Sequence, residues 1–185
     1  MFATIYLPNF YLQAAMRHQP ELRTLPVALI EEQENKPVII QLNHAAESAG
    51  VRKGMTPSQA LARCLRVVIK TRERAQEKSI TEILIQHAFT LSPFVESTGP
   101  GVCTIQFGRQ PSRLSGEAGC LSSAAKVARV IEQLAKCEIA AQAGIADLPD
   151  ASYLAAHLAR PVLQIDDAKK FLAPLSIETL AIALS

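Results

Sequence analysis

The 185-residue sequence lacks the features that mark membrane and secreted proteins. No stretch reaches the roughly 18–20 uncharged apolar residues that a membrane-spanning helix needs. The opening residues Met1–Pro8 contain no lysine or arginine, so we expect no secretory signal peptide. Hydrophobic residues make up 49% of the chain and charged residues 19%, which is usual for a globular protein with a core. We therefore expect a cytoplasmic protein with no membrane partner.

Cysteine is scarce and widely spaced. Cys64, Cys103, Cys120 and Cys137 form no Cys-x-x-Cys pair, which disfavours a zinc site. A disulfide framework is not expected in a chain of this size, so we expect free thiols in a reducing compartment. The sequence also contains no P-loop, no glycine-rich dinucleotide fingerprint and no Ser/His/Asp spacing typical of a hydrolase.

Acidic residues are absent from one long segment. The net charge of +2 is too small to indicate a nucleic-acid-binding protein by itself, but no Asp or Glu occurs between Ala49 and Arg72. A basic face of this kind suits a phosphate backbone, although an unevenly charged, solvated surface would have the same sequence pattern. The candidate DNA-backbone contacts in this segment are Arg52, Lys53, Arg63, Arg66, Lys70 and Arg72.

The hydrophobic patterns predict short strands mixed with amphipathic helices. Thr56-Pro57-Ser58-Gln59 combines an N-cap threonine, a proline at the first helical position and a glutamine three residues after the cap, which is typical of a helix start. The order of elements fits an α+β fold with a ferredoxin-like β-α-β-β-α-β sheet, helices on one face and an inserted lobe. Strands are expected at residues 2–7, 27–30, 38–41, 67–69, 94–97, 102–107 and 138–145, and helices at 9–17, 44–49, 57–64, 74–90, 121–136, 150–158, 166–172 and 177–184.

Four segments carry a recognisable pattern in a fixed order along the chain: Thr4–Tyr11, Asn43–Met55, Ser92–Glu96 and Ala143–Pro161. The most specific stretch is AGVRKGMTPSQALARC at residues 49–64, which begins within the second segment and extends beyond it. Together these segments resemble the Y-family (translesion) DNA polymerases. Within that family the sequence is most similar to the ImuB-type proteins of bacterial mutagenesis cassettes.

The resemblance implies a polymerase-like domain organisation. Residues 1–10 and 71–160 would form the palm, residues 11–70 a small fingers lobe, and residues 161–185 the start of a helical thumb. The last residues, 181–185, are apolar and carry no cap or polar tail, so we expect the sequence to be a piece of a longer protein.

When the sequence is matched to the Y-family motifs, the resemblance implies that the metal-binding carboxylates of the family are absent from this chain. Family polymerases open with an Asp-x-Asp strand, where this sequence has Tyr6-Leu7-Pro8. Their second metal motif, Ser-Ile-Asp-Glu, matches Gly99-Pro100-Gly101-Val102 without a gap. Nucleotidyl transfer needs two Mg²⁺ ions held by hard oxygen ligands, and a phenol, a glycine and a valine are poor substitutes for them. We therefore expect no metal, no cofactor and no catalysis.

Residues that would contact the triphosphate are also replaced. A Tyr-x-x-Arg pair of the family corresponds to His44 and Glu47, and a palm lysine corresponds to Pro149. Tyr11 stands where the family has its sugar-discriminating aromatic residue, although a structural aromatic residue is the simpler interpretation. Asp147 and Asp150 could replace the lost metal ligands, but N-capping of the helix that follows is the simpler role.

The resemblance implies a non-catalytic scaffold or adaptor subunit in DNA repair by translesion synthesis, acting in damage-induced (SOS) mutagenesis. Its implied partners are an error-prone replicative-type polymerase subunit, a RecA/SulA-like accessory protein and the sliding clamp, bound through residues beyond 185, with DNA as a further partner. One alternative is an active translesion polymerase with an unusual metal site. Another is a purely structural lobe.

Overall fold

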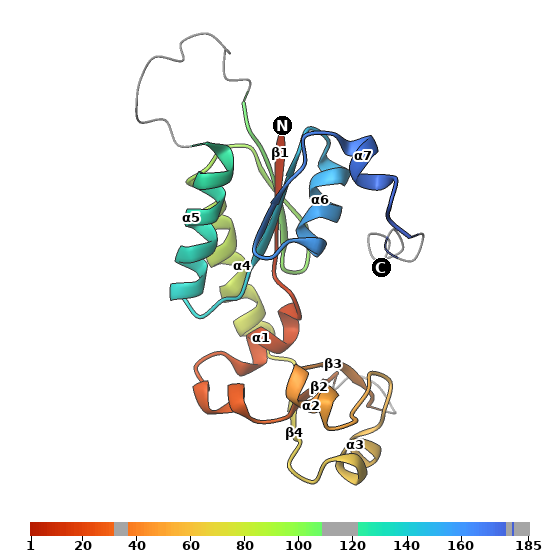
Figure 1. Ribbon diagram of the computed structural model, residues 1–185. Coiled ribbons are helices and arrows are strands. Elements are labelled where there is room, and N and C mark those ends of the chain that lie inside the picture. The colour runs from red at the N-terminus through yellow and green to blue at the C-terminus, as the bar shows by residue number, and fades with distance from the viewer. Residues whose placement is uncertain (32–36, 109–121, 177–178, 180–185) are drawn as a thin grey trace. The chain divides into compact units, whose positions relative to one another are not determined.

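The computed structural model describes residues 1–31, 37–108, 122–176 and 179. The chain forms two compact units, the first made of Met1–Pro8 and Thr81–Ser185 and the second of Asn9–Ile80 (Figure 1). Among the described residues, no helix has both the length and the hydropathy that crossing a membrane requires.

The first unit is built on a five-stranded sheet with the order β5-β6-β1-β7-β8. Strand β1 is antiparallel to both of its neighbours, β6 and β7, while β8 is parallel to β7. The succession β1-α4-β5-β6-α5-β7 with this strand order is ferredoxin-like, which confirms the predicted fold class. The elements are β1 (Phe2–Tyr6), α4 (Arg74–Phe89), β5 (Val95–Gly99), β6 (Val102–Gln106), α5 (Ser123–Lys136), β7 (Gln142–Ala146), α6 (Pro149–Leu158), β8 (Val162–Gln164) and α7 (Ala168–Leu172).

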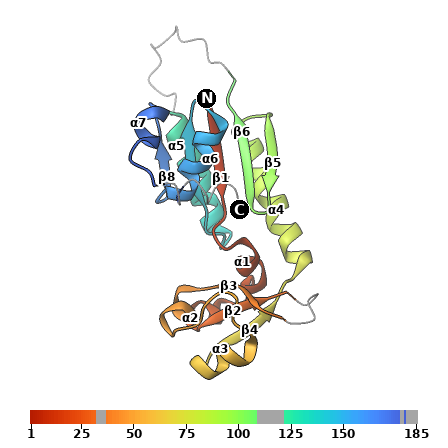
Figure 2. The same cartoon turned by 90° about the vertical axis from the view of Figure 1, so that its right-hand side faces the viewer.

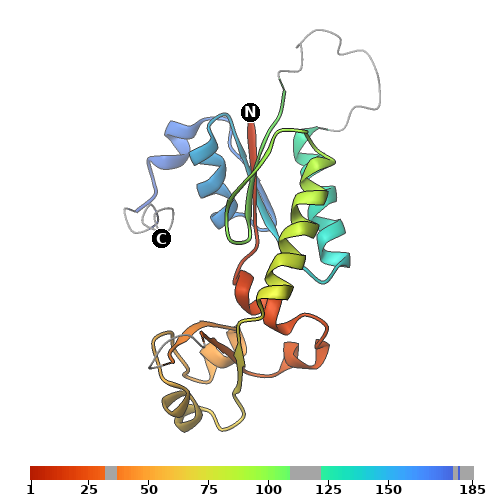
Figure 3. The ribbon, with the colours of Figure 1, turned by 180° about the vertical axis from the view of Figure 1, so that it is seen from behind.

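Alternation along the strands gives the sheet two different faces. One face is apolar, and α4 and α5 lie on its side of the sheet (Figures 1 and 3). Helix α5 begins at Ser122, whose hydroxyl accepts a hydrogen bond from the Ala125 amide. The buried side chains of this face and of α5 form the core of the unit: Ala3, Ile5, Ile105, Ala143, Ile145, Val127 and Leu134.

Helix α6 lies against the other face, so the prediction of helices on one face holds only for α4 and α5 (Figures 1 and 2). The reason is Gly144 in β7, which has no side chain to keep the helix away. A Cβ atom there would overlap the Ser152 carbonyl oxygen and the Ala156 nitrogen. The Thr4 hydroxyl also lies 2.8 Å from the Ser152 hydroxyl, which ties β1 to α6.

The second unit contains a three-stranded sheet with the order β3-β2-β4, in which β2 is antiparallel to β3 and parallel to β4. Two turn-like segments of this unit are fixed by their side chains. Thr56 and Gln59 form the predicted capping box at the start of α3, and the Asn43 side chain caps α2. The elements are α1 (Phe10–Met16), a 3₁₀ helix (Pro20–Thr24), β2 (Val27–Ile30), β3 (Ile39–Leu42), α2 (His44–Ser48), α3 (Pro57–Arg63) and β4 (Val68–Thr71).

The palm, fingers and thumb ranges stay predictions. The second compact unit ends at Ile80, so α4 begins in the second unit and continues into the first. Arg72 pairs with Glu77 and Glu31 inside the second unit. Residues 162–164, expected to belong to the thumb, form β8 and extend the sheet beside β7.

Two other predictions are only partly covered by the described residues. Cys64, Cys103 and Cys137 are free thiols, whereas Cys120 lies outside the described residues. The helix predicted at residues 177–184 also lies almost wholly outside them.

Candidate functional site

The positions that correspond to the family's metal ligands meet at one end of two paired strands. Tyr6 at the end of β1 lies opposite Val102 at the start of β6. The Leu7 amide donates a hydrogen bond to the Gly101 carbonyl oxygen at 2.8 Å. The structure thus brings together Tyr6, Gly101 and Val102, three positions that the resemblance matched to metal ligands. Their side chains are a phenol, a hydrogen atom and an isopropyl group.

The phenol of Tyr6 is packed against α6. Its ring lies 3.9 Å from the His157 ring, centroid to centroid, and the Tyr153 ring lies 4.7 Å from the His157 ring on its own helix. Burial raises the pKa of Tyr6 above its usual value, with a smaller contribution from Tyr153. Burial lowers the pKa of His157, whose Nε2 is buried and has no hydrogen-bond partner among the described residues. Both Tyr6 and His157 are therefore uncharged at neutral pH.

This ring cluster was not found by sequence reasoning. The available signal was the i, i+4 spacing of Tyr153 and His157, which places both side chains on one face of a helix. The partner on the sheet could not be identified from spacing, because it depends on where α6 packs.

The two aspartates considered as replacement ligands lie on the surface. Asp147 and Asp150 are both exposed, and neither caps α6. The predicted N-capping role is therefore wrong: Pro149 takes the first helical position, so the N-cap residue is Leu148, which has no capping side chain. Among the described residues, no group of three or more His, Cys, Asp or Glu side chains could hold a metal ion.

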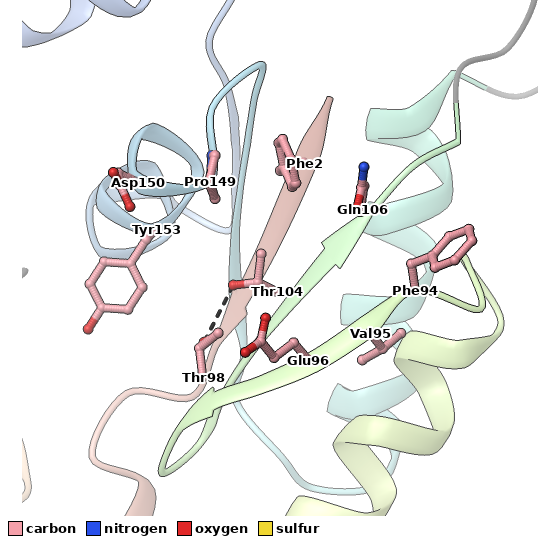
Figure 4. A pocket seen from close by; sticks show the side chains of 10 residues that line it. All are labelled: Phe2, Phe94, Val95, Glu96, Thr98, Thr104, Gln106, Pro149, Asp150 and Tyr153. Atoms are coloured by element: carbon pink, nitrogen blue, oxygen red, sulfur yellow. Dashed lines mark hydrogen bonds between the residues drawn. The ribbon is translucent and has the colours of Figure 1, made fainter.

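A pocket of about 890 Å³ lies on the same face of the sheet as α6 (Figure 4). Strands β1, β5 and β6 contribute one side, and the first turns of α6 contribute the other. Its charged residues are Glu96 and Asp150, and neither of these carboxylates forms an ion pair within the described chain. The lining residues are Phe2, Phe94, Val95, Glu96, Thr98, Thr104, Gln106, Pro149, Asp150 and Tyr153.

The positions predicted to have lost triphosphate contacts are accessible in the second unit. His44 and Glu47 are exposed on α2, and the Glu47 carbonyl oxygen accepts a hydrogen bond from Arg52 at 2.6 Å. Tyr11 is half-buried, with the Arg72 guanidinium stacked 3.9 Å from its ring centroid. This packing supports the interpretation of Tyr11 as a structural aromatic residue.

The basic segment is divided by the structure into exposed and internally paired side chains. Arg72 forms two hydrogen bonds to Glu77, at 2.8 and 2.7 Å, and one to Glu31 at 2.7 Å. These bonds raise the pKa of Arg72 above its usual value. Lys70 lies 3.3 Å from the Gln19 side chain and 3.7 Å from Glu73. The cations that remain exposed are Arg52, Lys53, Arg63 and Arg66.

Arg72 therefore differs from the surface contact that the sequence predicted. Its guanidinium forms ion pairs with the carboxylates of Glu31 and Glu77 and stacks on the ring of Tyr11, all inside the second unit. A DNA phosphate would have to displace these ion pairs. The four exposed cations stay candidates for phosphate contact.

Comparison with known proteins decides the family. A model of the impB/mucB/samB family matches residues 5–157. The chain belongs to this family. It is a homologue of Y-family DNA polymerases, as the sequence resemblance predicted, while the ImuB-type assignment stays a prediction.

Curated relatives of this family member include DNA polymerase IV of Yersinia pestis and of Photorhabdus laumondii. Both are 25% identical over 154 residues, which is 82% of this chain and 42% of the relative. The chain thus spans less than half the length of these relatives.

Solved structures show the same fold. The insertion ternary complex of Dbh DNA polymerase superposes with a TM-score of 0.78 at 13% identity, covering 96% of this chain and 53% of that one. DinB from Sulfolobus solfataricus gives a TM-score of 0.77 at 14% identity, covering 96% and 52%. These likenesses establish the α+β architecture.

Proposed function

We propose that this chain is a non-catalytic, polymerase-like scaffold or adaptor that acts in translesion DNA synthesis and damage-induced mutagenesis. The main support for this proposal is that Tyr6 pairs with Val102, next to Gly101, where β1 ends and β6 begins. The resemblance implies that family polymerases hold their metal ions at this place. A working polymerase needs carboxylate oxygens at this place.

The chemistry of the three side chains argues against metal binding. Two Mg²⁺ ions bring four positive charges together, and the protein must offset much of this charge with anionic oxygens. The phenol of Tyr6 is neutral at pH 7 because its ordinary pKa is near 10, and burial raises that pKa further; its ring packs against His157. Gly101 and Val102 supply no side-chain oxygen at all.

The residues at the positions matched to triphosphate contacts also support this proposal, in each of the two units. In the second unit, the exposed carboxylate of Glu47 stands where the family has an arginine for the triphosphate. In the first unit, Pro149 replaces a lysine and is the first residue of α6. A carboxylate repels a triphosphate, and a proline offers it neither a charge nor an N–H donor.

The identity of the binding partners is inferred from the family resemblance and not from a surface of this chain. We propose DNA, an error-prone replicative-type polymerase subunit, a RecA/SulA-like accessory protein and the sliding clamp. DNA contact would use the exposed cations Arg52, Lys53, Arg63 and Arg66 of the second unit.

A primer-extension assay tests the absence of catalysis. The chain is incubated with primed DNA and all four deoxynucleotides in Mg²⁺ or Mn²⁺, at a concentration where DNA binding has been verified by a mobility shift. We expect no extended primer with either metal, because the residues at the strand ends where the ions would be held are Tyr6, Gly101 and Val102. Extension by the wild-type chain would instead support the alternative, an active polymerase that uses an unusual metal site.

A further inference from the structure

The pocket beside α6 has a lining that is suited to a cation and unsuited to a phosphate. Glu96 and Asp150 are exposed carboxylates, and among the described residues that line the pocket there is no lysine, arginine or histidine. A polyanion would therefore meet uncompensated negative charge, whereas a positively charged group would be attracted.

Two lining hydroxyl groups, those of Thr98 and Thr104, end a chain of hydrogen bonds that begins at the buried residues Ser152 and Thr4. Ser152 donates its only hydroxyl hydrogen to the Pro149 carbonyl oxygen at 2.7 Å, so Thr4 must donate to Ser152 at 2.8 Å. The Thr4 hydrogen is then used, so Thr104 donates to Thr4 at 3.2 Å. By the same reasoning Thr98 donates to Thr104 in a long bond of 3.4 Å (Figure 4). With their hydrogens donated to neighbouring hydroxyl groups, the Thr98 and Thr104 oxygens are left to act as acceptors.

Aromatic rings that line the pocket favour a planar, delocalised cation. Phe94 is 63% exposed, and Phe2 and Tyr153 line other parts of the pocket. A guanidinium group can stack on such rings and bind a carboxylate through two parallel hydrogen bonds, whereas an ammonium group is a compact point charge.

We propose that this pocket binds an arginine-bearing peptide segment of a protein partner. The volume of about 890 Å³ exceeds what one side chain fills, so apolar neighbours of the arginine would occupy the space beside Phe2, Phe94 and Val95. The role of this contact in an assembly rests on the proposed scaffold function. The binding itself does not, because it involves neither nucleotide nor metal.

A nuclear magnetic resonance titration tests the proposal. The ¹⁵N-labelled chain is titrated with the capped tripeptide acetyl-Leu-Arg-Leu-amide and, separately, with the same peptide carrying citrulline, which keeps the shape of arginine but not its charge. Amide signals of Thr98, Thr104 and Tyr153 are expected to shift with the arginine peptide. We expect the citrulline peptide to bind about fivefold more weakly or worse, since it cannot form charge-assisted bonds.

Variants of the two carboxylates locate the effect. Glu96→Gln and Asp150→Asn together should weaken arginine-peptide binding about tenfold, by analogy with the loss of charged hydrogen bonds. Glu132→Gln, on the exposed side of α5, is the matched control and should leave binding unchanged. Because all three carboxylates are exposed, the variants should fold, and their amide spectra verify this.

Three outcomes would overturn the proposal. The first is equal binding of the arginine and citrulline peptides, and the second is unchanged binding by the double variant. The third is a shift of the same amide signals by a single-stranded oligonucleotide or by spermidine at lower concentration than the peptide. None of these outcomes bears on catalysis, so the scaffold proposal and the pocket proposal can fail separately.

Discussion

At the scale of single residues, Tyr6 at the end of β1 lies in a cluster of aromatic rings. Tyr6, His157 and Tyr153 pack together, and the environment keeps Tyr6 and His157 uncharged. Tyr6 therefore has an aromatic packing role between β1 and α6.

The pH dependence of stability should report on His157. Burial lowers the pKa of His157 in the folded chain, so below about pH 6.5, the usual value, the unfolded chain binds more protons. The stability that the neutral ring contributes is present above that pH and is lost as the pH falls toward the folded-state pKa. We expect the free energy of unfolding, measured by urea denaturation between pH 7.5 and 5, to decrease less in His157→Phe than in the wild type.

A matched variant separates this effect from the titration of other groups. His44→Phe changes an exposed histidine on α2 and should keep the wild-type slope. If His157→Phe and His44→Phe show the same dependence on pH, the ring of His157 is not held neutral by burial.

At the scale of elements, the packing of α6 on the sheet depends on one position that has no side chain. Gly144 lies where β7 contacts α6. A Cβ atom added there would meet backbone atoms of α6 and the Ala155 side chain. A backbone contact of this kind cannot be relieved by a change of rotamer.

Gly144→Ala should therefore be strongly destabilising. We expect a loss of about 3 kcal/mol or more in the free energy of unfolding, at the upper end of overpacking effects in cores. Urea denaturation measures the loss, and Gly108→Ala is the control because a Cβ there meets nothing within 4 Å. A loss below about 1 kcal/mol, within the range of tolerated swaps, would show that α6 can move away from β7.

Sequence patterns predicted the elements well where the signal is local. The capping box at Thr56 and the amphipathic helix α5 both follow from spacing and side-chain chemistry. The face of the sheet that α6 covers could not be predicted from these patterns, because α6 is rich in alanine and shows no strong hydrophobic stripe. The decisive residue, Gly144, lies in a strand rather than in the helix.

At the scale of the whole chain, the fold and the family could be predicted because several weak motifs occur in the right order. The resemblance matched Tyr6 and Val102 to metal-ligand positions without predicting that they pair, and the structure places them opposite each other. The ring cluster and the internal pairing of Arg72 could not be predicted. Both depend on partners distant in sequence, such as Glu31 and His157, whose side chains meet only in the folded chain.

DNA binding by the exposed cations should be independent of sequence and sensitive to salt. Plotting the logarithm of affinity against that of salt concentration should give a falling line, and each phosphate contact adds about 0.9 to its slope on duplex DNA. Arg63→Ala and Arg66→Ala should each reduce the slope by about 1 if they contact phosphates. Lys136→Ala, on α5 of the other unit, is the control. An affinity that does not change between two salt concentrations would exclude this mode of binding.

The most direct test of the central claim is a calorimetric titration of the chain with a deoxynucleoside triphosphate in Mg²⁺, repeated in Mn²⁺. A variant that restores the family's carboxylates, Tyr6→Asp with Gly101→Asp and Val102→Glu, is titrated in parallel. We predict no detectable heat for the wild-type chain at millimolar ligand, and metal-dependent heat for the variant if it keeps the fold. Metal-dependent binding to the wild type tighter than about 100 µM, roughly 5.5 kcal/mol, would contradict the proposal that this site has lost its nucleotide chemistry.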